Sequence, residues 1–423
     1  MNDSEIKKKL AKLWKDTFGD SDQYVSLIFN KNYNPEFCEY EEVGGDIVAG
    51  LLGVPYEFGN AGQRIRALYL CGLATKPQFR SRGIMTRLLA RINEKARNSG
   101  FAFTFLIPGD PGLRKYYKDR DYVNGFYRVI DNYTSLHDFD REYESILAEQ
   151  KEKVADLKRR LFQSLKTGVY NPSDANSNLV RDGIRTLIRE LEDGQEDLQI
   201  LHADRDIWII IDENTISGGK IYYVENSSGK ITAVAFTTIC DSAVNIHKMF
   251  ASDLASKYKL LGAVKTANPD LAIQHYIPSI EMNRAALWMR TYGSFMKDAR
   301  QVGSISITER VYSLAAHARV YGMVRILNLS EILKFQANSR RELKYSILAK
   351  ADDVYTVEQI NVADGKLSVK KIPIDPASPS QTTHVMTKRD IGEILFRRRD
   401  TDNLITEAFG IPSINGAISL LLD

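Results

Sequence analysis

The sequence predicts a mixed α/β protein with more than one domain. An apolar run over residues 67–75 has the length and composition of a buried strand, and Lys76-Pro77 ends it. A helix is predicted to open at Gly83, because apolar residues then recur at helical spacing, at Ile84, Leu88, Leu89, Ile92 and Ala96. A second apolar strand is predicted over 101–107. At 423 residues the chain is longer than one core usually supports, so we expect two or three domains.

The first 130 residues are predicted to run helix, helix, strand, strand, strand, helix, strand, helix, strand. The first helix has one apolar face, with Ser4 as its expected cap and Gly19 as its expected stop. Strands over 46–58 and 64–75 flank a hairpin signal at 59–62. This part of the chain therefore forms a compact α/β unit.

The sequence patterns that predict the remaining helices and strands are weaker. A charged helical stretch covers 138–166, and its outer face either meets solvent or forms an interface. A loop at 170–177 precedes a helix at 184–191 and short strands at 198–201, 207–211, 220–225 and 231–239. Further on we expect a strand running into a helix over 321–333, strands at 343–349, 354–362 and 366–372, and a helix at 387–396.

Composition narrows the class of protein. Hydrophobic residues make up 43% and charged residues 26% of the chain, as in ordinary soluble globular proteins. A net charge of +3 argues neither for nor against nucleic acid, and we expect no such partner. No apolar stretch approaches the roughly 20 residues of a membrane span, and the N-terminus lacks the apolar core of a signal peptide. Three scattered cysteines predict no disulfide framework, and six histidines show no metal-ligand spacing. We expect a cytoplasmic protein without a metal.

The loop before Gly83 has features of a binding site for a negatively charged ligand. A glycine where a loop enters a helix lets backbone N–H groups approach a ligand, and the helix N-terminus favours negative charge. Arg80 and Arg82 add positive charge beside it. These residues suggest a phosphorylated ligand, although a basic loop is more often a solvated turn.

Three segments together resemble the GNAT N-acetyltransferases. Residues 73–85 resemble the acetyl-CoA loop of that family, whose pattern is Gln/Arg-x-x-Gly-x-Gly/Ala. Arg80 and Gly83 fill the first two positions, while Met85 departs from the small residue usual at the third. After the second apolar strand, Tyr117 and Tyr122 match the closing element of the family, with Asp121 in place of its usual glycine.

The resemblance implies a CoA site and a general acid. Its cofactor-binding residues would be Leu73, Ala74, Thr75, Arg80, Ser81, Arg82, Gly83, Ile84, Met85 and Thr86. Tyr117 is the candidate acid, with its neighbour Tyr116 as a rival. The cations further along the helix either help to bind CoA or form a solvated face.

Domain order resembles the enhanced intracellular survival type of acetyltransferase. That resemblance implies a catalytic GNAT domain at 1–150, a degenerate GNAT-like domain at 151–310 and a sterol-carrier-protein-like domain at 311–423. The second unit has no Arg-x-x-Gly around 250–258, so we expect no CoA there. The resemblance also implies a homo-oligomer.

The general base is the hardest residue to predict. No histidine precedes His137, so a carboxylate acting through water is one candidate. In the resembled family the C-terminal carboxylate enters the active site, which points to Asp423; an ordinary last strand or helix explains the same tail.

These features predict an acetyl-CoA-dependent N-acetyltransferase acting on a primary amine of a small molecule or a lysine. The relatives suggest a cationic acceptor, which Asp20, Asp22 and Glu36 could attract, although such acids are usually solvated. The alternative is a non-catalytic protein that binds or senses an acyl-CoA or a lipid.

Overall fold

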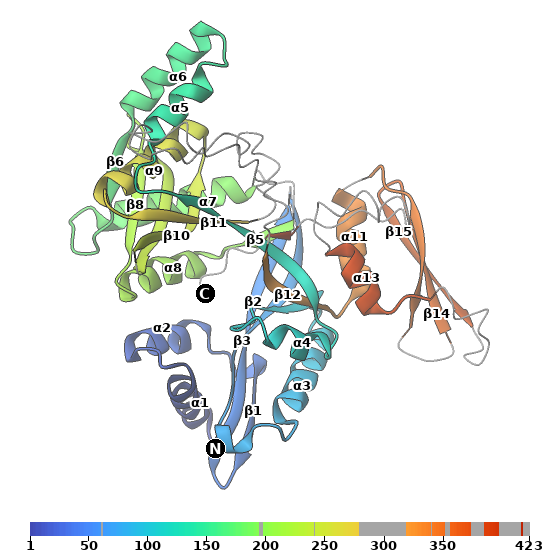
Figure 1. Ribbon diagram of the computed structural model, residues 1–423. Coiled ribbons are helices and arrows are strands. Elements are labelled where there is room, and N and C mark those ends of the chain that lie inside the picture. Colours follow the sequence, from blue (N-terminus) through green and yellow to red (C-terminus); the bar gives the residue numbers. More distant parts are fainter. Residues whose placement is uncertain are drawn as a thin grey trace, which may run out of the picture.

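A computed structural model describes residues 1–60, 62–193, 198–240, 242–278, 319–339, 341–351, 356–373, 385–396 and 416–417. The first unit follows the predicted order of elements (Figure 1). Its helices are α1 (Asp3–Phe18), α2 (Asp22–Asn32), α3 (Ile84–Asn98) and α4 (Leu113–Lys118). Its strands are β1 (Cys38–Val43), β2 (Asp46–Asn60), β3 (Gln63–Thr75), β4 (Phe103–Leu106) and β5 (Val123–Tyr133).

The ends of α1 and α3 show how local sequence sets these elements. Gly19 ends α1 in the left-handed region, as predicted, but the cap is Asn2 and not Ser4. Asn2 is the N-cap residue because it forms a reciprocal capping box with Glu5. The Asn2 side chain accepts from the Glu5 N–H, and the Glu5 side chain accepts from the Asn2 N–H. In α3, every residue of the predicted apolar face is buried.

The sheet of the first unit is completed by a strand from late in the chain. Strand β12 (Arg319–Ile326) lies between β4 and β5 and pairs antiparallel with both. Beyond β12, β5 pairs on its other edge with β11 (Ala272–Pro278). One large sheet therefore runs through segments that the sequence assigns to three domains, and the boundaries near residues 150 and 310 stay predictions.

The second unit is a further α/β layer on the same sheet. The charged stretch forms two helices, α5 (Phe139–Leu147) and α6 (Glu152–Ser164). Then follow β6 (Lys166–Val169), α7 (Ser177–Asp193), β7 (Leu198–Leu201), α8 (Asp204–Ile216), β8 (Lys220–Glu225), β9 (Ile231–Cys240), β10 (Ala243–Ala251) and α9 (Leu254–Ala267).

One prediction in this unit is wrong. Residues 207–211 were expected to form a strand, but they lie inside helix α8. A short apolar run does not distinguish a buried strand from a buried helix. The Asp206 carboxylate accepts from the Ala203 N–H at 2.8 Å and so helps to start the helix.

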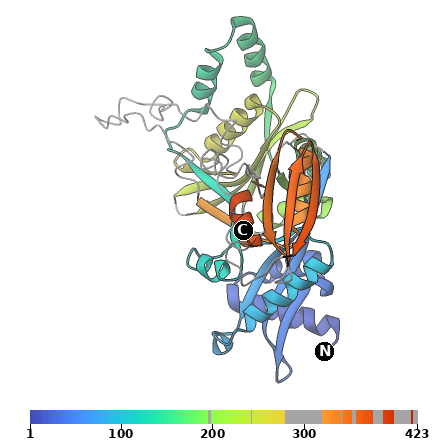
Figure 2. The same cartoon turned by 90° about the vertical axis from the view of Figure 1, so that its right-hand side faces the viewer.

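The last part of the chain adds a smaller layer. After β12 come α11 (Leu329–Ser339), β13 (Tyr345–Lys350), β14 (Thr356–Ala363), β15 (Lys366–Pro373), α13 (Lys388–Leu395) and β16 (Gly416–Ala417). Strands β13–β15 form a separate antiparallel sheet, which faces the viewer in Figure 2. In Figure 1, α11 and α13 lie between this sheet and the first unit.

An aromatic cluster joins the first unit to the end of the chain. Phe58, Phe103, Phe105 and Phe126 are fully buried and pack mostly edge to face. Phe396, at the end of α13, stands 5.9 Å from Phe103 and 6.2 Å from Phe126 between ring centroids. This packing fixes α13 against the sheet. Among the described helices, none has the length and apolarity needed to span a membrane.

Candidate active site

The loop into α3 presents backbone N–H groups to the outside. Gly83 is the N-cap residue with φ +70°, and no side chain of the described residues caps the helix there. A Cβ built on Gly83 would meet only the Arg87 guanidinium, at 3.7 Å, so the space in front of the helix is open. The first intrahelical bond runs from the Arg87 N–H to the Gly83 carbonyl, which leaves the N–H groups of Ile84, Met85 and Thr86 without helical partners.

Two arginines flank this open helix end. The Arg80 side chain donates from Nε to the Thr75 carbonyl at 3.1 Å, which ties the loop to the end of β3. The Arg82 guanidinium lies 5.1 Å from the centre of the Phe79 ring. Ser81, between them, has φ +60°. The structure thus gathers the predicted loop residues around one helix N-terminus, where the dipole favours an anion.

The other cations of α3 have a different role. Arg91 and Lys95 contact the two oxygens of the nearly buried Glu39 carboxylate at 2.8 and 2.7 Å. Arg87 pairs with Glu41 at 3.4 Å. Glu39 and Glu41 belong to β1, so these ion pairs join α3 to that strand. The structure thus gives Arg87, Arg91 and Lys95 a structural contact with β1, while a CoA contact of these cations stays a prediction.

At the end of β3, one edge is not paired with any described strand. β3 and β4 pair in parallel only from residues 67–69 to 103–105, while β3 continues to Thr75. The pairing of β3 with β2 skips a residue near Gly72, which has φ +60°. A Cβ on Gly72 would come within 2.3 Å of the Trp14 ring, so this bulge requires glycine. Leu73, Ala74 and Thr75 follow Gly72, on the part of β3 that no longer pairs with β4.

Tyr117 lies on α4 and is 6% exposed. Its ring stands edge to face against Tyr116 at 5.3 Å and Tyr122 at 5.9 Å. Burial raises the pKa of the Tyr117 hydroxyl well above its ordinary value near 10. No hydrogen bond joins that hydroxyl to another of the described residues. A protonated phenol without such a partner is suited to donate to a substrate atom.

Arg120 joins the two parts of the site, and sequence reasoning missed it. Its guanidinium lies 3.5 Å from the centre of the Tyr116 ring and donates to the Tyr116 carbonyl at 2.6 Å. It also donates twice to the Thr86 hydroxyl, at 2.7 and 3.1 Å. The spacing of four residues from Tyr116 could have suggested the first contact, but nothing local points to Thr86. The Thr86 hydroxyl is therefore engaged, and its backbone N–H remains available.

Asp121 stands where the family pattern usually has glycine, and the structure shows how the aspartate is accommodated. It has φ +65°, a conformation that favours glycine and that aspartate tolerates better than most residues. Its carboxylate pairs with Arg325 of β12 at 3.1 Å. The side chain at this position thus gains a partner from the far end of the chain.

Other predicted site residues lie elsewhere. Asp20 accepts from the Trp14 indole at 2.7 Å and Asp22 pairs with Lys15 at 2.6 Å, so both carboxylates already have partners. Asp423 lies outside the described residues. Strand β16 pairs with β7, which in turn pairs with β2 at residues 57–59.

The second unit has a different helix start at the corresponding place. Helix α9 is capped by Asp253, whose carboxylate accepts from the Ser256 N–H at 2.8 Å. A carboxylate here occupies one N–H and repels a further anion. This arrangement supports the expectation that CoA does not bind there.

Comparisons with known proteins agree with this geometry. Residues 1–123 match a family model described as an acetyltransferase (GNAT) domain. A search of curated proteins gave no significant match. Among solved structures, a probable N-acyltransferase from Enterococcus faecalis has a TM-score of 0.62 at 11% identity, over 97% of this chain and 91% of that one.

Two further structures are similar over nearly the whole chain. A GCN5-related N-acetyltransferase from Anabaena variabilis has a TM-score of 0.61 at 11% identity, with 99% and 98% of the two chains covered. Eis1 from Mycobacterium abscessus has a TM-score of 0.58 at 9% identity, with 98% and 92% covered. The resemblance to GNAT proteins is confirmed for the first unit, and the multidomain resemblance is confirmed as a likeness of fold.

Proposed function

We propose that the chain is an acetyl-CoA-dependent N-acetyltransferase that acts on a primary amine. The proposal rests above all on the uncapped start of α3 at Gly83, which lies near the edge of β3 that no described strand pairs with. The GNAT domain match over residues 1–123 supports acyl transfer in general, as does the similarity to a probable N-acyltransferase and a GCN5-related N-acetyltransferase.

Each part of acetyl-CoA has a matching surface in this proposal. The N–H groups of residues 84–86 would hold the pyrophosphate, with Arg80 and Arg82 as charge-assisted donors. The open edge of β3 at Leu73–Thr75 would pair with the pantetheine arm. An N–H from this edge aimed at the thioester oxygen would stabilise the oxyanion, typically by about 3–4 kcal/mol.

Tyr117 would complete the transfer. As the amine nitrogen bonds to the acetyl carbon, the carbon–sulfur bond breaks and the sulfur leaves with its electron pair. The Tyr117 hydroxyl would give its proton to that sulfur, and solvent would return one to the phenolate. The transfer moves the negative charge from the sulfur to the Tyr117 phenolate, which burial also disfavours, and the proton returned by solvent then neutralises it.

A carboxylate would take the proton from the amine, and we propose the C-terminal one. Ala417 lies in β16, and Asp423 follows it by six positions, a span of at most about 22 Å. A short tag added after Asp423 should therefore reduce turnover by roughly tenfold or more, while leaving the melting temperature unchanged. The same tag before the exposed Met1 is the matched control. Equal activity of both tagged proteins would point to an internal carboxylate acting through water.

A turnover screen tests the function itself. Acetyl-CoA is offered with a panel of amines that includes polyamines and lysine peptides, and free thiol is measured with time. The proposal expects thiol release that depends on one class of amine. A chain that only binds acyl-CoA or a lipid would saturate with acetyl-CoA and release no thiol with any amine.

A further inference from the structure

Helix α6 carries an apolar stripe on its outer side. Val154, Leu157 and Leu161 are spaced as one side of a helix, and their side chains are 44%, 68% and 43% exposed. The other side of α6 packs inward, since Ala155 is buried and the Phe162 ring is stacked on an α5 tyrosine with 4.7 Å between centroids. Figures 1 and 2 both show α5 and α6 projecting from one end of the molecule. The stripe therefore lies on an accessible, projecting part of the surface.

Cations flank this stripe on both sides. At about 100° of rotation per residue, Lys158 lies on one side of the stripe, and Lys153 and Arg160 lie on the other. The two acids of the helix, Glu152 and Asp156, lie roughly 130–170° from the middle of the stripe. The outer side of α6 is thus apolar along its middle and positive along both margins.

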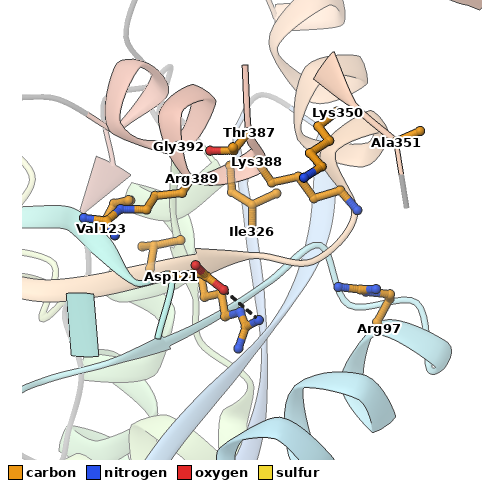
Figure 3. Close-up of a pocket in the computed structure, with 12 residues that line it drawn as sticks. Arg97, Asp121, Val123, Ile326, Lys350, Ala351, Thr387, Lys388, Arg389 and Gly392 are labelled. Carbon is orange, nitrogen blue, oxygen red and sulfur yellow. Dashed lines mark hydrogen bonds and ion pairs between the residues drawn. The ribbon is translucent and has the colours of Figure 1, made fainter. Parts of the chain in front are cut away.

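The flanking cations have no ion-pair partner among the described residues. By contrast, Arg159 lies on the inward side and pairs with Glu144 at 2.8 Å and with Asp156 at 2.9 Å. Arg325, in the last part of the chain, likewise pairs with Asp121 at 3.1 Å, as Figure 3 shows with a dashed line. An anionic surface could therefore contact the flanking cations of α6 without first displacing a carboxylate.

The size and charge of this face favour a lipid surface over a protein. Helix α6 has 13 residues, so its outer face measures about 20 Å by 10 Å, or roughly 200 Å². A specific protein–protein interface buries about 800 Å² on each partner and needs a complementary shape. A second copy of α6 would place positive margins against positive margins, which is unfavourable. A bilayer needs no matching shape, and its affinity for a helix grows with apolar area and with attraction to anionic lipids.

We infer that α6 attaches the protein to the surface of anionic lipid membranes. The three apolar side chains of the stripe would enter the boundary between headgroups and acyl chains. The flanking cations would extend to the lipid phosphates, where each adds to the attraction. The helix would lie in the surface, because 13 residues are too few for the roughly 20 of a membrane span. This attachment is independent of the acetyl transfer proposed above.

Co-sedimentation of the full chain with lipid vesicles tests the inference. The vesicles are phosphatidylcholine alone, or phosphatidylcholine with about 30% phosphatidylserine as the anionic lipid. We expect saturable binding to the mixed vesicles, at least about tenfold stronger than to the neutral ones and weakened by salt. The double variant Leu157→Gln/Leu161→Gln should bind the mixed vesicles at least about tenfold more weakly.

The matched control is Leu179→Gln/Ile239→Gln, which removes two exposed apolar side chains from α7 and β9 of the same unit. It should bind within about twofold of the parent. Absence of saturable binding of the parent to the mixed vesicles would overturn the inference, and so would an equal loss in both double variants.

A second pair of variants tests the charge. Lys153→Gln/Arg160→Gln should weaken binding to the mixed vesicles by roughly tenfold, while Lys370→Gln/Lys371→Gln, at exposed residues of β15, should leave it within about twofold. Sedimentation velocity without lipid completes the test. Self-association of the parent that is lost in Leu157→Gln/Leu161→Gln would assign the stripe to a second copy of the chain and overturn the inference.

Discussion

Gly83 and Gly100 lie at the two ends of α3 and share one backbone conformation. Their φ angles are +70° and +80°, and neither has a close neighbour where a Cβ would stand. They differ in surroundings, since only Gly83 faces the open helix N-terminus. A substitution at Gly100 therefore controls for backbone strain in a test of Gly83.

Gly83→Val should abolish CoA binding. The β-branched side chain would stand where the N–H groups of residues 84–86 must approach a phosphate, and the backbone would be strained as well. Gly100→Val should carry a similar strain and bind CoA as the parent does. Calorimetry with CoA distinguishes the two, and parental binding by the Gly83→Val protein would show that the loop assignment is wrong.

Tyr117→Phe should lower kcat by at least about tenfold with CoA affinity nearly unchanged. Only the hydroxyl is lost, and general acid–base catalysis contributes about 10²–10⁴-fold. Tyr116→Phe is the control, because its ring still stacks on Arg120. If Tyr116→Phe instead shows the defect, Tyr116 is the acid.

At the level of residues, sequence predicts what depends on neighbours along the chain. Gly83 and the apolar face of α3 follow from local spacing, and both are as expected. The ion pair of Asp121 with Arg325 joins residues 204 positions apart, so no local pattern indicates it. The same reason hides the contact of Arg120 with Thr86.

Arg120, two residues after α4, links that helix to α3 through its side chain. Arg120→Ala would remove the stacking on Tyr116 and both hydrogen bonds to Thr86, with a loss of about 2 kcal/mol between α4 and α3. We expect kcat to fall by roughly tenfold, because Tyr117 would no longer be held relative to the thioester. Steady-state kinetics measure the effect.

The control variant is Lys115→Ala on α4, whose exposed side chain pairs, among the described residues, with the Asp119 carboxylate one turn further on. Arg120→Lys should recover only part of the activity, since lysine has no planar guanidinium. Loss of stability with kcat unchanged would give Arg120 a purely structural role.

Element prediction succeeded where amphipathic spacing and turn residues agreed. α3, β2 and β3 lie within a few residues of their predicted bounds because glycine, proline and periodicity all mark them. α8 was predicted as a strand because its apolar run is short and buried on most sides. Its helical state depends on packing with distant elements, which the sequence does not display.

The whole molecule depends on β12. Without this strand, β4 and β5 of the first unit lose the strand that pairs with both of them. The buried side chains of Phe103, Phe105 and Phe126 would then be more exposed to water. A fragment of residues 1–135 should therefore be poorly soluble and lack a cooperative thermal transition. Co-expression with residues 311–423 should restore both, as measured by soluble yield and near-ultraviolet circular dichroism. A fragment that folds alone would contradict this dependence.

The position of β12 also has a consequence for synthesis. The ribosome completes β5 at Tyr133, and roughly 190 residues follow before β12 ends at Ile326. At about 5–20 residues per second, this interval lasts about 10–40 s. During that time the nascent first unit has an unfilled gap in its sheet. It can reach its final fold only after Ile326 has been added, which makes it a natural client for chaperones that shield apolar surface on nascent chains.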